Sequence, residues 1–292
     1  MTTKTFAVAG GDLRCVHLAE LLAAHGNTVH SFALDKCTLT DTIVKLPSLN
    51  ELKNKYDALL LPLPLEAESG YLNAPYSINS YLIEDIFSVL PPGQKVIAGK
   101  VSHKLLSRAG KLGLSLFDYL EREEFSVANA VPSAEGAIQI ALEKLPITLN
   151  SAKALVIGYG RIGKILARYL SGFGTKVTVS ARKFSDFAWI SALGYDSLNT
   201  NDLSGKISGF DVIFNTVPKE ILGANLLREL TPKTLIIDLA SHPGGVDLFT
   251  AKERGLDVVW ALSLPGKVAP LTAAESMAKT VFNILEEWGD TK

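Results

Sequence analysis

Residues 154–163 read ALVIGYGRIG, and this stretch decides the fold of the second half of the chain. Four apolar residues predict a short buried strand, and three glycines with the spacing G-x-G-x-x-G follow it directly. In such a turn Gly158 permits the tight bend, Gly160 lets a pyrophosphate approach the backbone, and Gly163 lets the next helix pack closely on the strand. That helix would direct free backbone N–H groups at the phosphates. The residues expected at a dinucleotide are therefore Gly158, Gly160, Arg161, Ile162 and Gly163.

The same order of elements opens the first half of the chain. A strand at 6–9 runs into two glycines, and a helical stretch leads to a strand at 28–34, which together make a right-handed βαβ unit. Further strands are expected at 58–61, 95–98, 114–117, 176–180, 211–215, 234–238 and 257–261. Because these strands alternate with helical stretches, the sequence predicts an α/β protein with two Rossmann-like, doubly wound domains in series.

A connecting helix is expected between the two domains, with Ser133 as a plausible N-cap and Pro146 closing it. A final helix is expected to begin at Thr272, which forms a capping box with Glu275, and to pack its apolar stripe back across the domain boundary. The predicted segments are a substrate and catalytic domain at 1–130, the connecting helix at 131–146, a dinucleotide-binding domain at 147–270 and the C-terminal helix at 271–292.

Charge and cysteine content exclude several classes of protein. Among 292 residues, 29 are Lys or Arg and 30 are Asp or Glu, so a net charge of −1 gives no field that favours nucleic acid or an anionic membrane. Cys15 and Cys37 are too few for a disulfide framework and lack a neighbouring ligand cluster, so no metal site is expected. The longest apolar run, residues 59–65, contains two prolines and is too short to span a bilayer. We expect a cytoplasmic protein.

The choice of dinucleotide depends on the end of the second strand. An NAD site usually has Asp or Glu there to bind the ribose 2′-OH, but residues 179–183 read VSARK. No carboxylate repels a 2′-phosphate, and Ser180, Arg182 and Lys183 offer donors for one, which favours NADP(H). A solvated basic turn is the alternative reading.

Other cofactor contacts are expected where strands 211–215 and 234–238 end, since ligands of open α/β sheets bind at the carboxyl ends of the strands. These contacts are Thr216, Val217, Pro218 and Ala240. Residues 263–272 read SLPGKVAPLT and are expected to form a loop that closes over the nicotinamide or links to the last helix.

Three further stretches carry a resemblance to a known family: NAVPSAEGA at 129–137, AGGDLR at 9–14 and PGKVAP at 265–270. With the glycine turn, they resemble the A subunits of bacterial dipicolinate synthases, in the same order and over essentially the whole chain. The resemblance implies an NADP-linked oxidation in the spore-forming branch of lysine biosynthesis, in which dihydrodipicolinate or 4-hydroxy-tetrahydrodipicolinate is aromatised to dipicolinate. It also implies a partner, the flavoprotein-like B subunit, together with a location in the mother-cell cytoplasm during sporulation.

A substrate with two carboxylates requires cations or N–H donors in its site. The candidates for substrate binding are Arg14, His103, Ser133 and Lys267, and the candidates for catalysis are His242 and Lys100. All except Ser133 stand just past a predicted strand, where each is equally well an ordinary surface charge. Ser133 either caps its helix or donates to a carboxylate. His242 is the first candidate for a general acid, because a hydrated substrate must lose water, although spontaneous dehydration would leave that role empty.

Two other readings compete with this one. A D-2-hydroxyacid dehydrogenase has the same two-domain plan, but it places an Arg after the fifth strand and a His before the last helix. Here strand 234–238 runs into Ala240-Ser241-His242-Pro243, and no His follows His242. A non-catalytic dinucleotide-binding component of a larger complex is the other alternative, because binding a dinucleotide does not require turning it over. A homo-oligomer is the default expectation.

Overall fold

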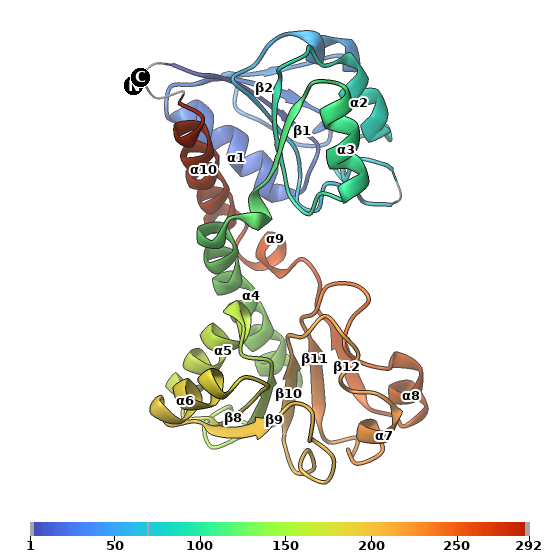
Figure 1. The fold of residues 1–292 in the computed structure, drawn as a ribbon, viewed down its shortest axis with the longest axis vertical. Helices are drawn as coiled ribbons and strands as arrows, with labels where there is room; N and C mark the ends of the chain where they lie inside the picture. Colours follow the sequence, from blue (N-terminus) through green and yellow to red (C-terminus); the bar gives the residue numbers. More distant parts are fainter. Residues whose placement is uncertain (1–2, 69, 290–292) are drawn as a thin grey trace. The chain divides into compact units, whose positions relative to one another are not determined.

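The computed structural model describes residues 3–68 and 70–289, and Figure 1 shows their course. The chain forms two compact units. Unit 1 contains the described residues up to Ala128 together with those from Ala269 onward, and unit 2 is Asn129–Val268. In the described ranges, no helix combines the length and the hydrophobicity needed to cross a membrane.

Unit 1 is built on a six-stranded parallel sheet with the order β3-β2-β1-β4-β5-β6. Its strands are β1 (Thr5–Ala9), β2 (Thr28–Phe32), β3 (Ile43–Lys45), β4 (Ala58–Leu60), β5 (Lys95–Ala98) and β6 (Ser115–Asp118). Side chains alternate between the two faces of a strand. Phe6 and Val8 of β1 therefore enter one hydrophobic cluster, and Ala7 and Ala9 enter another on the opposite face.

Helices cover both faces of this sheet (Figure 1). The Phe6 face packs against α1 (Leu13–Ala24) and α10 (Pro270–Glu287), which lie side by side. The opposite face packs against α2 (Ile83–Val89), α3 (His103–Lys111) and the 3-10 helix η1 (Leu49–Lys53), and a second 3-10 turn, η2 (Tyr119–Glu121), follows β6. Met277, Val281 and Leu285 of α10 are buried in the first cluster, so the expectation that the C-terminal helix packs back across the domain boundary is confirmed.

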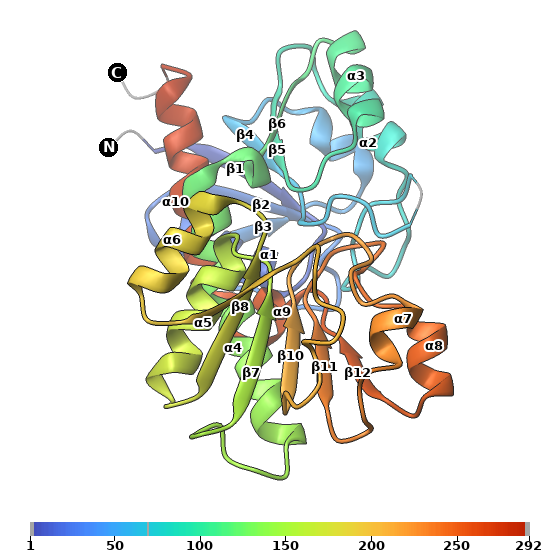
Figure 2. The ribbon, with the colours of Figure 1, turned by 60° about the horizontal axis from the view of Figure 1, so that its bottom comes forward.

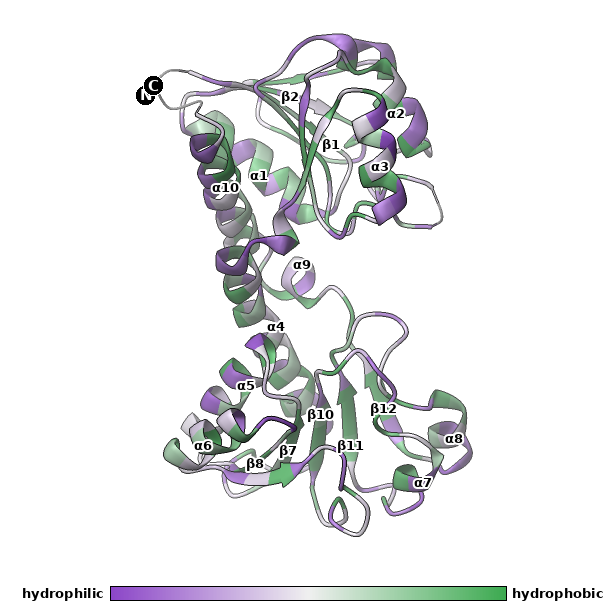
Figure 3. Cartoon of the chain, in the orientation of Figure 1, coloured by the Kyte–Doolittle hydropathy of each residue, from purple (hydrophilic) through white to green (hydrophobic). Residues whose placement is uncertain are grey.

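Unit 2 repeats the arrangement, with the strand order β12-β11-β10-β7-β8-β9 (Figure 2). Its strands are β7 (Lys153–Ile157), β8 (Lys176–Ala181), β9 (Asp196–Asn199), β10 (Val212–Asn215), β11 (Leu235–Asp238) and β12 (Asp257–Trp260). One face carries α5 (Arg161–Gly172), α6 (Phe184–Ala192) and part of α4 (Glu123–Lys144), and the other carries α7 (Ala224–Leu227) and α8 (Leu248–Glu253). Hydrophobic residues are concentrated on the central strands β10 and β11 (Figure 3), as expected of parallel strands buried on both faces.

The predicted fold class, two Rossmann-like domains in an α/β chain, is confirmed. Each unit has one strand that the sequence did not reveal, β3 in unit 1 and β9 in unit 2. Both lie at a sheet edge, where one side of the strand is unpaired and few side chains are buried. The residues of β9 read DSLN, so no apolar run marks this strand.

The connecting helix differs from its prediction. Helix α4 begins at Glu123, before the expected segment, and it contains Pro132 in its interior. Ser133 is therefore not an N-cap; its hydroxyl donates to the carbonyl of Asn129 one turn earlier, at 2.8 Å. A proline inside a helix removes one intrahelical hydrogen bond, so Pro132 indicated a helix start rather than a helix interior. The division between the units falls in this helix, between Ala128 and Asn129.

The segment before the last helix also differs from its prediction. Instead of a loop, a short helix α9 (Leu264–Val268) precedes α10, which begins at Pro270 with Ala269 as its N-cap residue. Thr272 lies inside α10, so the expected capping box is wrong. Prolines suggested a loop, but Pro265 and Pro270 stand in first turns, where a helix needs no N–H from them.

Candidate functional site

The glycine turn of unit 2 has the geometry that its spacing predicts. Gly158 has a φ of +99°, and a Cβ atom there would lie 2.5 Å from Oγ1 of Thr216 and 2.8 Å from a methyl carbon of Val217. A Cβ atom on Gly163 would lie 2.1 Å from the carbonyl oxygen of Gly158. A larger residue at Gly163 would have to move the backbone, and one at Gly158 would have to move the Thr216 and Val217 side chains and adopt a strained φ, so β7, α5 and the loop after β10 pack closely at these two glycines.

Gly160 is different, because its surroundings are open. It is the N-cap residue of α5 with a φ of −83°, and a Cβ atom there would meet nothing within 4 Å. This is the end of a helix at which backbone N–H groups point outward, and where the positive end of the helix dipole lies. Bare backbone, free space and a helix N-terminus fit a pyrophosphate group at this turn.

At the end of β8, the three residues predicted to bind a 2′-phosphate differ in their exposure to solvent. Arg182 and Lys183 directly follow Ala181, the last residue of β8, and both are exposed. None of residues 179–183 is an Asp or a Glu. Ser180 is fully buried, and its hydroxyl oxygen accepts a hydrogen bond from the Thr200 hydroxyl at 3.0 Å. Its carbonyl accepts from the N–H of Gly158 at 3.0 Å. Ser180 therefore supports the glycine turn from inside, and the prediction that its hydroxyl lies with the two cations is wrong.

A buried polar pair that sequence reasoning did not single out shapes the neighbouring loops. The Asn215 amide, at the end of β10, donates to the Asp238 carboxylate at 2.8 Å and to the Val217 carbonyl at 3.0 Å. Asp238, at the end of β11, also accepts from the N–H groups of Ala240 at 3.1 Å and Gly245 at 2.8 Å. One pair thus fixes both loops that contain predicted cofactor contacts. The signal in the sequence was a polar residue ending each apolar strand.

Trp260 completes this edge of the sheet. Its indole N–H donates to the Ala240 carbonyl at 2.8 Å, so both backbone groups of Ala240 are engaged. The ring of the exposed His242 meets the Trp260 ring edge to face, with centroids 4.5 Å apart. The contact with Trp260 therefore holds the His242 ring in a defined place in the loop that also contains Ala240. Lys267 belongs to the same unit and is exposed on α9.

In unit 1, Arg14 is engaged by its own unit. Its side chain is 5% exposed, and its Nε and Nη2 atoms donate to Asp12 at 2.9 and 2.8 Å. Nη2 also donates to the Leu63 carbonyl. Burial lowers the pKa of Arg14, but the hydrogen bonds and charge of Asp12 outweigh that effect, and the net pKa is raised. This guanidinium ties the first glycine turn to the segment after β4.

The glycine turn of unit 1 is filled by the loop that follows β4. The N–H of Gly11 donates to the Asn73 carbonyl at 2.8 Å, and a Cβ atom on Gly10 would lie 2.7 Å from Leu72. Beyond β2, the Asp35 carboxylate accepts from the Ser77 hydroxyl and the Ile78 N–H, both at 3.1 Å. The space that a dinucleotide would need at this turn is taken by the chain itself.

The remaining candidates belong to different units. Lys100 and His103 are exposed at the carboxyl end of β5, where the Asp118 carboxylate holds the N–H groups of Lys100 at 3.1 Å and Val101 at 2.6 Å. Ser133 is buried in α4 with its hydroxyl engaged. The structure thus brings Thr216 and Val217 of the β10 loop close to Gly158, and it distributes the substrate candidates over two units. Across residues 3–68 and 70–289, no cluster of three or more His, Cys, Asp or Glu side chains is suited to a metal ion.

Comparison with known proteins matches both units. The family model for the N-terminal domain of the dipicolinate synthase A subunit covers residues 5–120, and that for shikimate / quinate 5-dehydrogenase covers residues 139–254. The dipicolinate synthase A subunit of Bacillus subtilis is 29% identical over 289 residues, which are 98% of this chain and 97% of that protein.

Two solved structures agree with this match. The dipicolinate synthase A chain from Bacillus subtilis has a TM-score of 0.89 at 28% identity and covers 100% of this chain and 99% of its own. The corresponding protein from Bacillus halodurans has a TM-score of 0.89 at 30% identity, with coverages of 98% and 99%. With the dehydrogenase-type fold of unit 2, these matches identify a dinucleotide-binding oxidoreductase subunit with a nicotinamide cofactor. The chain belongs to the family of dipicolinate synthase A subunits.

Proposed function

We propose that this chain uses NADP⁺ to oxidise dihydrodipicolinate, or its hydrated form 4-hydroxy-tetrahydrodipicolinate, to dipicolinate. The observation that carries the proposal is the open glycine turn at Gly160, with the exposed cations Arg182 and Lys183 at the next strand end, in a chain of this family. The reaction would belong to the spore-forming branch of the lysine pathway, and it would take place in the mother-cell cytoplasm during sporulation.

The cofactor would be held mainly by backbone. Gly160 and the first N–H groups of α5 receive the pyrophosphate, and Thr216, Val217 and Pro218 border the site from the loop after β10. The preference for the 2′-phosphate comes from Arg182 and Lys183, because charge-assisted hydrogen bonds to phosphate are the stronger ones. Ser180 has no part in it, since its hydroxyl is buried.

Oxidation of the dihydropyridine ring removes a hydride, which the nicotinamide accepts, and a proton, which passes to water or a base. The protein's task is to align the donor carbon with the cofactor and to bind two carboxylates. We assign carboxylate binding to the exposed His103 and Lys267, and catalysis to Lys100 and His242, with His242 as the general acid for loss of water. Arg14 and Ser133 are not retained as substrate contacts, because both are buried and committed to partners in their own units.

The test uses the purified chain, NADP⁺ and freshly generated product of dihydrodipicolinate synthase under anaerobic conditions. Dipicolinate and NADPH are followed together, against an enzyme-free control and the Gly160→Val variant, whose side chain enters the open space of the turn. The proposal expects both products to appear in equal amounts above the two controls.

The alternative is a dinucleotide-binding component without its own activity. The family name contains the word subunit, which implies a partner, and we propose the flavoprotein-like B subunit for that role. If neither product rises until the second subunit is added, the alternative is correct and the assignments of Lys100, His103, His242 and Lys267 must be revised.

A further inference from the structure

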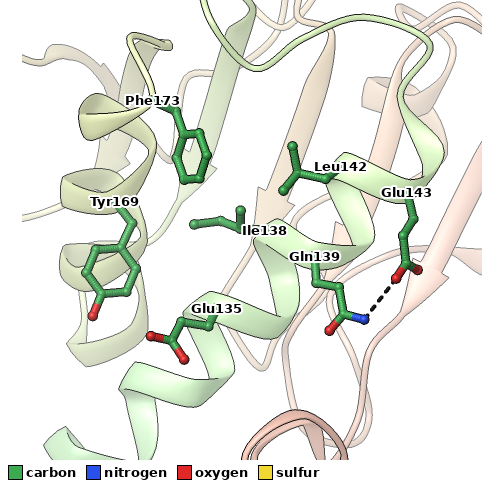
Figure 4. Close-up of a pocket in the computed structure, with 7 residues that line it drawn as sticks. All are labelled: Glu135, Ile138, Gln139, Leu142, Glu143, Tyr169 and Phe173. Carbon is green, nitrogen blue, oxygen red and sulfur yellow. Dashed lines mark hydrogen bonds between the residues drawn. The ribbon is translucent and has the colours of Figure 1, made fainter.

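Unit 2 has a surface groove between α4 and α5, with a volume of about 660 Å³. Helix α4 lines it with Ile138 and Leu142, and α5 lines it with Tyr169 and the adjoining Phe173. In Figure 4, Ile138 and Leu142 point from α4 toward Phe173. Leu142 is 52% exposed and Phe173 is 44% exposed, so the groove presents apolar side chains to solvent at its centre.

One wall of the groove is acidic. Glu135, Gln139 and Glu143 are four residues apart along α4, so they form a single ridge beside the apolar residues. The Gln139 amide donates to the Glu143 carboxylate at 2.8 Å (Figure 4), and the nearby Lys144 is paired with Asp257 at 3.0 Å. The two glutamates are eight positions apart, which places them about 12 Å apart along the helix axis.

The apolar centre and the acidic wall of the groove indicate which chemical groups its ligand would carry. Apolar side chains one turn apart fill the centre of such a groove, and cations two turns apart meet the two glutamates. We propose that the groove binds an amphipathic helix of the second synthase subunit, with Lys or Arg along one flank. The inference rests on the proposed function only in that it takes the second subunit to exist.

A second copy of the chain fits this groove less well. In a two-fold contact whose axis crosses the ridge at a right angle, the two glutamate ridges would face one another, and like charges across an interface weaken it. The groove also leaves the cofactor turn free. Tyr169 and Phe173 stand near the end of α5, about 14 to 20 Å along the helix from Gly160, so both ligands can be bound at once.

The experiment measures binding of the purified second subunit to the full chain by titration calorimetry at low and moderate salt. We expect Leu142→Arg and the double variant Glu135→Lys/Glu143→Lys each to weaken the complex about tenfold or more. Salt should weaken the wild-type complex but should not weaken that of the double variant, whose lysines repel the partner's cations. The matched control reverses the same number of exposed acids elsewhere in unit 2, Asp196→Lys/Glu253→Lys, and should bind as the wild type does.

NADPH titration of every variant separates this inference from the proposed function, since cofactor affinity should stay within about twofold of the wild type. The inference is overturned if both groove variants bind the second subunit normally, or if the wild type does not bind it at all. Sedimentation gives a further check: a wild-type homodimer that Leu142→Arg dissociates would assign the groove to a second copy instead.

Discussion

Units 1 and 2 have sheets of the same strand order, and a glycine turn follows the first strand of each, yet the two turns are used in different ways. At Gly160 of unit 2 the backbone borders open space. At Gly11 of unit 1 the N–H is already bound by the Asn73 carbonyl, and Leu72 covers Gly10. A glycine turn after a strand therefore indicates the fold, while the segment above the turn decides whether a ligand can bind.

The loop after β4 also occupies a second position at which a nucleotide would bind, the acid after the second strand. In a dinucleotide site, an acid near the end of the second strand accepts from a ribose hydroxyl. In unit 1, Asp35 follows β2 and accepts from Ser77 and Ile78 of that loop. In unit 2, the corresponding strand end carries Arg182 and Lys183. Asp35 of unit 1 therefore binds a loop of its own unit, whereas Arg182 and Lys183 of unit 2 remain exposed.

The largest expected effect is on the open turn. Gly160→Val should weaken NADPH binding about 100-fold, equivalent to about 3 kcal/mol, because its side chain takes the space of the pyrophosphate. The melting temperature should fall only slightly, since apart from the chain neighbours nothing lies within 4 Å of the new Cβ, and the cost is that of a poorer N-cap residue. Fluorescence titration and thermal denaturation measure the two quantities. Gly172→Val, also in open space at the far end of α5, is the control and should bind normally. Normal affinity in Gly160→Val would remove the pyrophosphate from this turn.

The buried pair of unit 2 should matter chiefly for stability. Asp238→Ala leaves the Asn215 amide and two loop N–H groups without their acceptor, at a cost of about 3 kcal/mol in the free energy of unfolding. Asp238→Asn should lower the free energy of unfolding by less, because one oxygen remains to accept hydrogen bonds. It should still be destabilising, because its NH₂ group would face an N–H donor. Urea denaturation measures both variants. Equal stability of Asp238→Ala and the wild type would show that the pair does not hold the loops.

A smaller effect is expected at the exposed cations. Arg182→Glu should reduce the ratio of NADPH to NADH affinity about thirtyfold, because it replaces a phosphate donor with a repelling carboxylate. The measurement is the dissociation constant for each cofactor. Lys206→Glu, at an exposed site of the same unit, serves as the control for net charge. An unchanged ratio in Arg182→Glu would leave NADP preference without its proposed basis.

The smallest effect on cofactor binding is expected in unit 1. Gly10→Ala should destabilise the fold by about 2 kcal/mol, because the residue has a φ of +69° and its Cβ atom would press on Leu72. NADPH affinity should stay within about twofold, and calorimetry should give one dinucleotide per chain for variant and wild type. Two equivalents bound by the wild type would contradict the contrast between the turns.

Local sequence patterns predicted much of this structure, and the errors have a common physical origin. GYGRIG predicted the turn correctly because Gly158 and Gly163 each meet a local backbone or packing requirement. Ser133 and Thr272 were placed at helix ends, but the helices run past them because tertiary packing, rather than a cap, fixes where α4 and α10 begin.

The site was less predictable for the same reason. Ser180 was expected at a phosphate because sequence does not show which face of a strand is buried. Trp260 and the pair Asn215 and Asp238 were not singled out, since their contacts join strand ends that are distant along the chain.

The position of α10 has a consequence for biosynthesis. Its residues Ala274, Met277, Val281 and Ile284 complete the core that α1 begins, so the chain enters unit 1, leaves it for unit 2 and returns. During synthesis, all of unit 2 emerges before the last apolar helix of unit 1, and domains generally fold as units in the order of their emergence. Unit 2 can therefore fold on the ribosome while the apolar face of α1 is still exposed, because α10 has not yet been synthesised. A nascent chain stalled before Ala274 would be the form of this protein that chaperones recognise.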